Sequence, residues 1–147
     1  MKIDKILFPT DFSDVSYESI SFVNKVVRKL ESKLLLLHVV EYTPQSSFYE
    51  IVEESQDDIL KMIRIKNEKK LRKMAEQFYG IEIERYVIQG DPFEEIIKFI
   101  DKEEVDLIIL PTHGHTSLIH SLIGSVAEKI FRKAPCSVLT VKPKQLP

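Results

Sequence analysis

The sequence predicts an open α/β fold, in which a parallel five-stranded sheet carries helices on both faces. Short apolar runs lie at residues 5–8, 34–40, 81–88, 105–110 and 137–141. They alternate with longer segments in which apolar residues recur at three- and four-residue spacing, as on one face of a helix. Parallel strands joined through helices use right-handed crossovers, so helices should cover both faces of the sheet.

The first strand is expected at residues 5–8, where Pro9 ends an apolar run typical of a buried parallel strand. Ser13, or Asp11, is a good N-cap for a helix whose apolar face spans residues 17–30. Asp11 has two possible roles at this point. It can satisfy backbone donors of the turn, or it can accept from a ligand hydroxyl at the carboxyl end of a central strand.

Residues 34–40 predict a second strand, apolar except for His38 and far too short to cross a membrane. A histidine in such a run is usually a satisfied core or edge residue, and we interpret His38 in that way. A loop at residues 41–49 should lead to a helix over about 50–78. Charged residues at 66–70 predict a break or an exposed turn in the middle of that helix, and a solvated face there.

The next segment predicts a strand, a short helix and a fourth strand. Gly80 is well placed as a C-terminal cap of the long helix, before a strand at residues 81–88. Gly90-Asp91-Pro92 should end that strand and begin a surface helix with one buried stripe at residues 93–100. The apolar run at 105–110 should form the fourth strand.

The loop after this fourth strand is where function is expected. Gly114 lies within it, and Gly124 with Ser125 opens a helical pattern that continues to Ala134. Free N–H groups at the start of that helix, with the Ser125 hydroxyl, could face an anion such as phosphate. The alternative is structural: one glycine relieves a turn and the other only begins a helix.

Composition limits the classes of function. The 147 residues, 44% of them hydrophobic, predict a single domain at 1–147 with one substantial core. A formal net charge of -2, with both signs mixed, argues against nucleic-acid and membrane partners. No signal-peptide pattern follows Met1, which predicts a cytoplasmic protein. Cys136 is the only cysteine and is expected to be a small core residue at a strand start.

Several common chemistries lack the residues that they need. The dinucleotide motif G-x-G-x-x-G and the P-loop are both absent, and no nucleophile elbow is present. The histidines His113, His115 and His120 share their loop with no carboxylate or cysteine, so no metal site built from protein side chains alone is expected. Enzyme activity is not expected, beyond at most slow ATP hydrolysis that depends on a nucleotide-bound divalent ion.

The late loop resembles a known nucleotide loop. Pro111, Gly114 and, after nine further residues, Gly124-Ser125 resemble the universal stress protein pattern G-x-x-G, nine residues, then G followed by S or T. The resemblance covers nearly the whole chain. It extends to the first strand with its Asp-bearing turn, the second strand, and the last helix and strand, at residues 6–13, 36–40, 126–130, 134–136 and 138–141.

The resemblance implies a Rossmann-like sheet with strand order 3-2-1-4-5 and an adenine-nucleotide site between strands 1 and 4. ATP or another adenine nucleotide would bind there and carry Mg²⁺ or Mn²⁺. Asp11 would lie near the ribose, Val39 against the base, and His113 beside the phosphates. The nucleotide-binding residues carried over are Pro9, Thr10, Asp11, Val39, Leu110, Pro111, His113, Gly114, Gly124, Ser125, Val126 and Ala127.

Pro111 stands where the ATP-binding members of that family carry their first glycine. Three functions therefore stay open: a stress-response module whose bound ATP governs the choice of partner or assembly, a member that lacks nucleotide and acts through its dimer surfaces, and a slow ATPase. The resemblance also implies a homodimer that pairs through residues 137–141, a short apolar edge strand.

Overall fold

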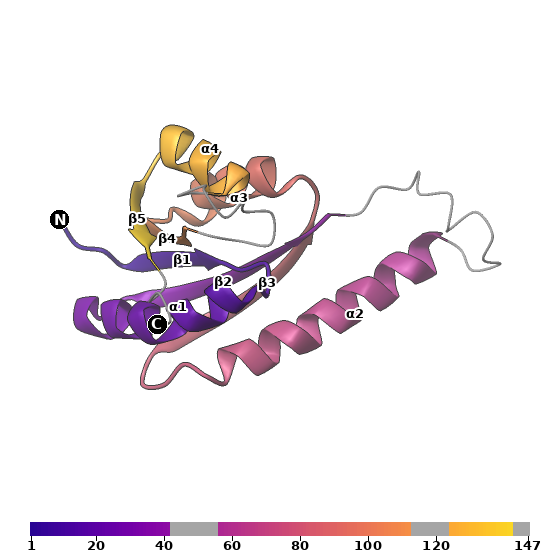
Figure 1. Cartoon of the computed structure of the whole chain (residues 1–147), viewed down its shortest axis with the longest axis horizontal. Helices are drawn as coiled ribbons and strands as arrows, with labels where there is room; N and C mark the ends of the chain where they lie inside the picture. Colours follow the sequence, from indigo (N-terminus) through magenta and orange to yellow (C-terminus); the bar gives the residue numbers. More distant parts are fainter. Residues whose placement is uncertain (42–55, 113–123, 143–147) are drawn as a thin grey trace.

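The computed structural model describes residues 1–41, 56–112 and 124–142. It confirms the predicted fold class: five parallel strands form one sheet in the order β3-β2-β1-β4-β5 (Figure 1). The predicted loop beyond residue 41, the start of the long helix at 50–55, and His113, Gly114, His115 and His120 lie outside the described residues. The strands are β1 (Lys5–Pro9), β2 (Lys33–Val40), β3 (Glu82–Gln89), β4 (Leu107–Pro111) and β5 (Ser137–Val141).

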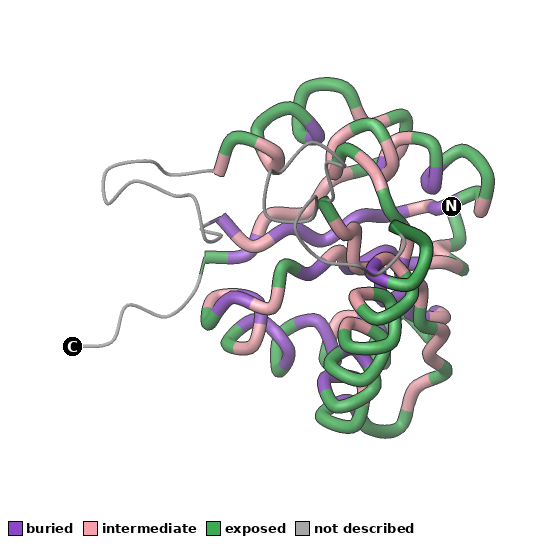
Figure 2. Tube along the Cα trace, turned by 90° about the vertical axis from the view of Figure 1, so that its right-hand side faces the viewer, coloured by how far each residue is buried: buried purple, intermediate pink, exposed green. Residues whose placement is uncertain are grey.

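Within the described residues, four helices cover the sheet, two on each face. Figure 1 shows α1 (Asp14–Leu30) and α2 (Gln56–Ala75) on one side of the sheet, and α3 (Pro92–Glu103) and α4 (Ser125–Lys133) on the other. In Figure 2 the central strands are mainly buried, whereas the outer surfaces of the helices are mainly exposed. The sheet is therefore the middle layer of three, and its strand ends are where a ligand can approach.

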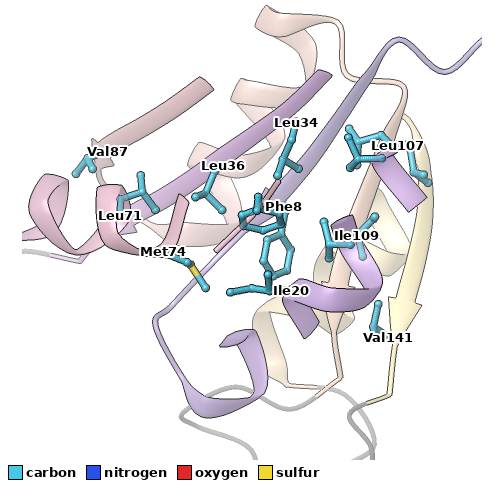
Figure 3. Close-up of a cluster of buried hydrophobic side chains, with 14 residues drawn as sticks. Phe8, Ile20, Leu34, Leu36, Leu71, Met74, Val87, Leu107, Ile109 and Val141 are labelled. Atoms are coloured by element: carbon cyan, nitrogen blue, oxygen red, sulfur yellow. The ribbon is translucent and has the colours of Figure 1, made fainter. Parts of the chain in front are cut away.

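Alternation along the strands sends successive side chains to two separate cores. Ile6 and Phe8 of β1 pack toward α1 and α2, while Leu7 between them packs toward α3 and α4. The first of these clusters contains Phe8 of β1, Ile20 of α1 and Met74 of α2, which are labelled in Figure 3. Both faces of β1 are fully buried, which explains why its sequence is a continuous apolar run.

The predicted starts of three helices are confirmed. Ser13 caps α1, where its hydroxyl accepts a hydrogen bond from the Ser16 N–H at 3.3 Å. Asp91 caps α3 in the same way, and Pro92 takes the first helical position. Gly124 occupies the N-cap position of α4, and, having no side chain, it offers no side-chain acceptor to the first N–H groups of that helix.

The long helix differs from its prediction at the C-terminal end. It ends at Ala75, because the N–H groups of Gln77 and Phe78 donate to carbonyls only three residues back and tighten the chain into turns. Gly80 is thus not the cap of this helix; it has a φ of +69° in the bend that leads to β3. The helix runs without a break, and its middle turn is exposed as predicted.

Candidate functional site

A cavity of about 540 Å³ opens at the carboxyl ends of β1, β2 and β4, beside the start of α4. This is the edge at which ligands bind in open α/β sheets, next to the point where the strand order reverses between β1 and β4. The volume lies in the range of small-molecule and cofactor sites. The cavity is lined by Pro9, Thr10, Asp11, Ser16, His38, Val39, Val40, Glu41, Pro92, Ile96, Leu110, Pro111, Gly124, Ser125, Val126, Ala127 and Ile130.

Most of the site residues that the sequence predicted come together in this cavity. Those that line it are Pro9, Thr10, Asp11, Val39, Leu110, Pro111, Gly124, Ser125, Val126 and Ala127. The other two, His113 and Gly114, lie outside the described residues. The described ten come from four segments far apart in the sequence, which meet because the parallel strands end at one edge of the sheet.

Asp11 lies in the turn between β1 and α1 and helps to shape it. Its Oδ1 accepts from the Ser13 N–H at 2.9 Å and from the Ser16 hydroxyl at 3.2 Å. Ser13, not Asp11, is the helix cap, so the carboxylate organises the approach to the helix and does not cap it. Asp11 lines the cavity, where an ionised carboxylate can accept hydrogen bonds from hydroxyl groups of a ligand.

The start of α4 forms another part of the cavity lining. Gly124, Ser125 and Val126 line the cavity, and the helix begins at Ser125. The first N–H groups of a helix have no intrahelical acceptor, and the helix dipole places partial positive charge at the same end. This part of the lining therefore presents donors suited to an anionic group, in the same cavity that Asp11 lines.

His38 is a wall residue that the sequence analysis did not assign to the site. Its Nδ1 lies 2.7 Å from the carbonyl oxygen of Thr10, and its ring lies 4.4 Å from the ring of Phe12. Burial lowers the pKa of His38, against smaller opposing effects of the Thr10 carbonyl and the Asp11 carboxylate. The satisfied histidine that we predicted is thus present, and it also faces the cavity.

Four of the other wall residues that sequence reasoning missed lie at the end of β2 or near the start of α3. Val40 and Glu41 follow Val39 at the end of β2, and Pro92 and Ile96 lie in the first turns of α3. The final residues of a parallel strand reach the ligand edge whatever their polarity. Position at a strand end, more than residue type, would have identified Val40 and Glu41.

The described residues contain neither a candidate metal cluster nor a candidate membrane span. In residues 1–41, 56–112 and 124–142, no group of three or more His, Cys, Asp or Glu side chains is arranged to hold a metal ion. None of the described helices is long and apolar enough to span a membrane.

Comparison with known proteins gives one family. The model of the universal stress protein family matches residues 2–142. A curated relative, the universal stress protein MJ0531 of Methanocaldococcus jannaschii, is 35% identical over 143 residues, which cover 94% of this chain and 81% of the relative. The solved structure of MJ0577, 29% identical, covers 99% of this chain and 100% of its own, with a TM-score of 0.79.

A universal stress protein solved in complex with cAMP has a similar fold. It is 19% identical, covers 98% of this chain and 100% of its own, and superposes with a TM-score of 0.67. The family match over nearly the whole length, together with the 35% identity to MJ0531, is decisive. The chain belongs to the universal stress protein family.

Proposed function

We propose that this protein binds an adenine nucleotide, ATP in the first place, in the cavity at the carboxyl ends of β1, β2 and β4. Asp11 accepts from the ribose, Val39 lies against the base, and the start of α4 meets the phosphates at Gly124, Ser125 and Val126. His113 and Gly114, outside the described residues, complete the phosphate side. Mg²⁺ or Mn²⁺ is carried by the nucleotide.

The single observation that carries this proposal is that one cavity combines an acceptor for sugar hydroxyls with donors for phosphate. The acceptor is the carboxylate of Asp11, and the donors are the first N–H groups of α4, whose N-cap residue Gly124 has no side chain to cap them. Apolar residues such as Val39 and Ile96 lie in the same lining and suit a flat base. The cAMP held by a structural neighbour supports the same class of ligand.

In this proposal the nucleotide governs which partner or assembly the protein joins in the stress response. The assembly is a homodimer through the free edge of β5. Within the described residues β5 pairs only with β4, and Val138 and Leu139 of that strand are half-buried. An apolar edge strand pairs readily with its own copy, because two such edges satisfy each other's backbone groups.

Light scattering at micromolar protein concentration tests the assembly. A mass of two chains is expected, and a mass of one chain would remove the dimer from the proposal.

A second candidate function is favoured by Pro111. Proline lacks the N–H that a glycine would offer at this point of the cavity wall, so a phosphate contact through that donor is impossible here. In this alternative the protein holds no nucleotide and acts through its dimer surfaces alone. Mass spectrometry of the small molecules released by heat from freshly purified protein separates the two. An adenine nucleotide is expected, and its absence favours the alternative.

A further inference from the structure

A histidine from one strand supports the turn that leaves the neighbouring strand. The Nδ1 of His38, on β2, lies 2.7 Å from the carbonyl oxygen of Thr10, which directly follows β1. A carbonyl oxygen can only accept, so Nδ1 carries the hydrogen and donates it. In neutral His38 this places the free lone pair on Nε2 and defines the tautomer.

The same histidine packs against the residue that follows Asp11. The ring of Phe12 lies 4.4 Å from the ring of His38, and the Nζ of Lys70, on α2, lies 5.6 Å from the ring of Phe12. The Phe12 ring is therefore contacted from β2 and from α2. Its backbone has a φ of +60°, a left-handed conformation that residues with a side chain adopt only where their surroundings favour it.

The rest of the turn is held by short local bonds. The Thr10 N–H donates to the Leu37 carbonyl at 2.8 Å, and the Phe12 N–H donates to the Thr10 hydroxyl at 3.0 Å. The Thr10 carbonyl is bound by the imidazole, and the Asp11 carboxylate accepts from Ser13. Among these hydrogen bonds, only the one from His38 joins the turn to a side chain on another strand.

We propose that His38 is a positioning residue of the nucleotide site: by donating from Nδ1 to Thr10 and packing on Phe12, it holds the turn that presents Asp11 to the cavity. This inference rests on the proposed nucleotide function for its role in binding. The positioning itself is a property of the ligand-free protein and can be measured there.

Among the described residues, the charged groups that act on His38 are Asp11 in the turn and Lys70 on α2. Asp11 acts to raise the pKa of His38 and Lys70 acts to lower it, and both effects are smaller than that of burial, which lowers it. The imidazole of His38 is therefore neutral in the folded protein at neutral pH. Its tautomer, and not its charge, is what orients the turn.

Two substitutions separate the hydrogen bond from the ring. His38→Asn keeps an N–H donor near the position of Nδ1 and loses the ring, whereas His38→Phe keeps a ring against Phe12 and loses the donor. Titration of magnesium-ATP is expected to show binding about 3- to 10-fold weaker for His38→Phe, the range for loss of one neutral hydrogen bond. His38→Asn is expected to recover most of that affinity.

A merely structural histidine would behave differently. His38→Asn, which loses the buried ring, would then weaken binding at least as much as His38→Phe and in proportion to its lower thermal stability. Rescue of affinity by asparagine without rescue of stability supports positioning. Equal affinity of wild type and His38→Phe overturns it.

Nitrogen NMR of the ligand-free protein gives a readout that does not depend on nucleotide. At pH 7.5 the spectrum of ¹⁵N-labelled histidine should show His38 protonated on Nδ1 and unprotonated on Nε2. The amide signals of residues 10–13 should move in His38→Phe and stay close to wild type in His38→Asn. The opposite tautomer, or unmoved amides in His38→Phe, overturns the inference even where wild-type protein binds ATP.

The two proposals fail in distinguishable ways. Wild-type protein that binds no magnesium-ATP contradicts the nucleotide function, and the NMR measurements then still support or overturn the positioning of the turn by His38. Wild-type protein that binds ATP, with His38→Phe binding equally well, contradicts only the positioning role.

Discussion

Pro111 and Val141 are the last paired residues of β4 and β5, and the chain directly after Pro111 remains tied to β5. The N–H of Thr112 donates to the Val141 carbonyl at 3.0 Å. Pro111 also lines the cavity. Pro111 therefore fixes the backbone φ angle at the start of the loop that follows β4, while the end of the sheet stays hydrogen-bonded. For a ligand, the feature that matters is the N–H that proline lacks.

Replacing Pro111 by glycine restores that donor. A hydrogen bond to a charged phosphate contributes roughly 1.5 to 3 kcal/mol, and the added loop freedom costs about 0.4 to 1 kcal/mol. Pro111→Gly should therefore bind magnesium-ATP about tenfold more tightly and unfold at a slightly lower temperature without ligand. Calorimetric titration and thermal unfolding measure both effects. Unchanged or weaker binding in a folded variant would show that position 111 makes no donor contact.

Asp11 should contribute to binding through its carboxylate. Asp11→Ala removes the acceptor for the Ser13 N–H and the Ser16 hydroxyl as well as the proposed ribose contact. We expect at least tenfold weaker binding of magnesium-ATP and a loss of stability of about 1 kcal/mol.

The matched control is Asp11→Asn, which keeps an oxygen acceptor for the turn and loses the charge. It should have a stability near that of wild type and an intermediate affinity. Wild-type affinity in Asp11→Ala, measured in the same titration, would place the ribose elsewhere.

Folding stability should depend on the protonation of His38. Its pKa is lowered from the usual 6.5 in the folded protein, mainly by burial. As the pH falls, the unfolded chain therefore binds a proton at His38 before the folded protein does. The contribution of neutral His38 to the free energy of unfolding is complete above pH 6.5, and it is lost as the pH falls through the pKa of His38 in the folded protein. Urea unfolding of wild type and His38→Asn across this window isolates the effect. Parallel pH profiles for the two proteins would contradict it.

The two methionines of α2 should differ strongly in their contribution to stability. Met74 is fully buried, whereas Met62 on the same helix is 60% exposed. Methionine and alanine are both good helix formers, so the effect of a Met→Ala substitution on stability mainly reflects the packing that the side chain loses. Met74→Ala should lower the free energy of unfolding by about 2 to 5 kcal/mol, and Met62→Ala by less than about 0.5 kcal/mol. Chemical denaturation measures both, and similar losses would contradict the packing of α2 on the sheet.

Much of the fold could be predicted from the sequence because each central strand is buried on both faces. Leu34–Leu37 and Ile108–Leu110 read as unbroken apolar runs for that reason. The strand order could not be derived from the residues, since any strand that is buried on both faces fits either place beside β1. It came from the resemblance to a family.

The cavity lining could be expected from the sequence where turn chemistry or the family motif marks it. Asp11 and Gly124 belong to recognisable turns, so their meeting at one cavity could be expected. His38 lies in an apolar run and is interpreted as a core residue, because a histidine in such a run is usually satisfied within the core. The end of α2 at Ala75 depends on local turns that could not be predicted from the residue types there.

Calorimetric titration of wild-type protein with magnesium-ATP, up to millimolar concentration, tests the central claim most directly. Saturable heat, an accompanying rise in the unfolding temperature, and the loss of both in Asp11→Ala are expected. A ligand that binds the folded state must raise its stability, so the two readouts check each other. No heat and no thermal shift at millimolar magnesium-ATP would contradict the account and leave a family member that works without nucleotide.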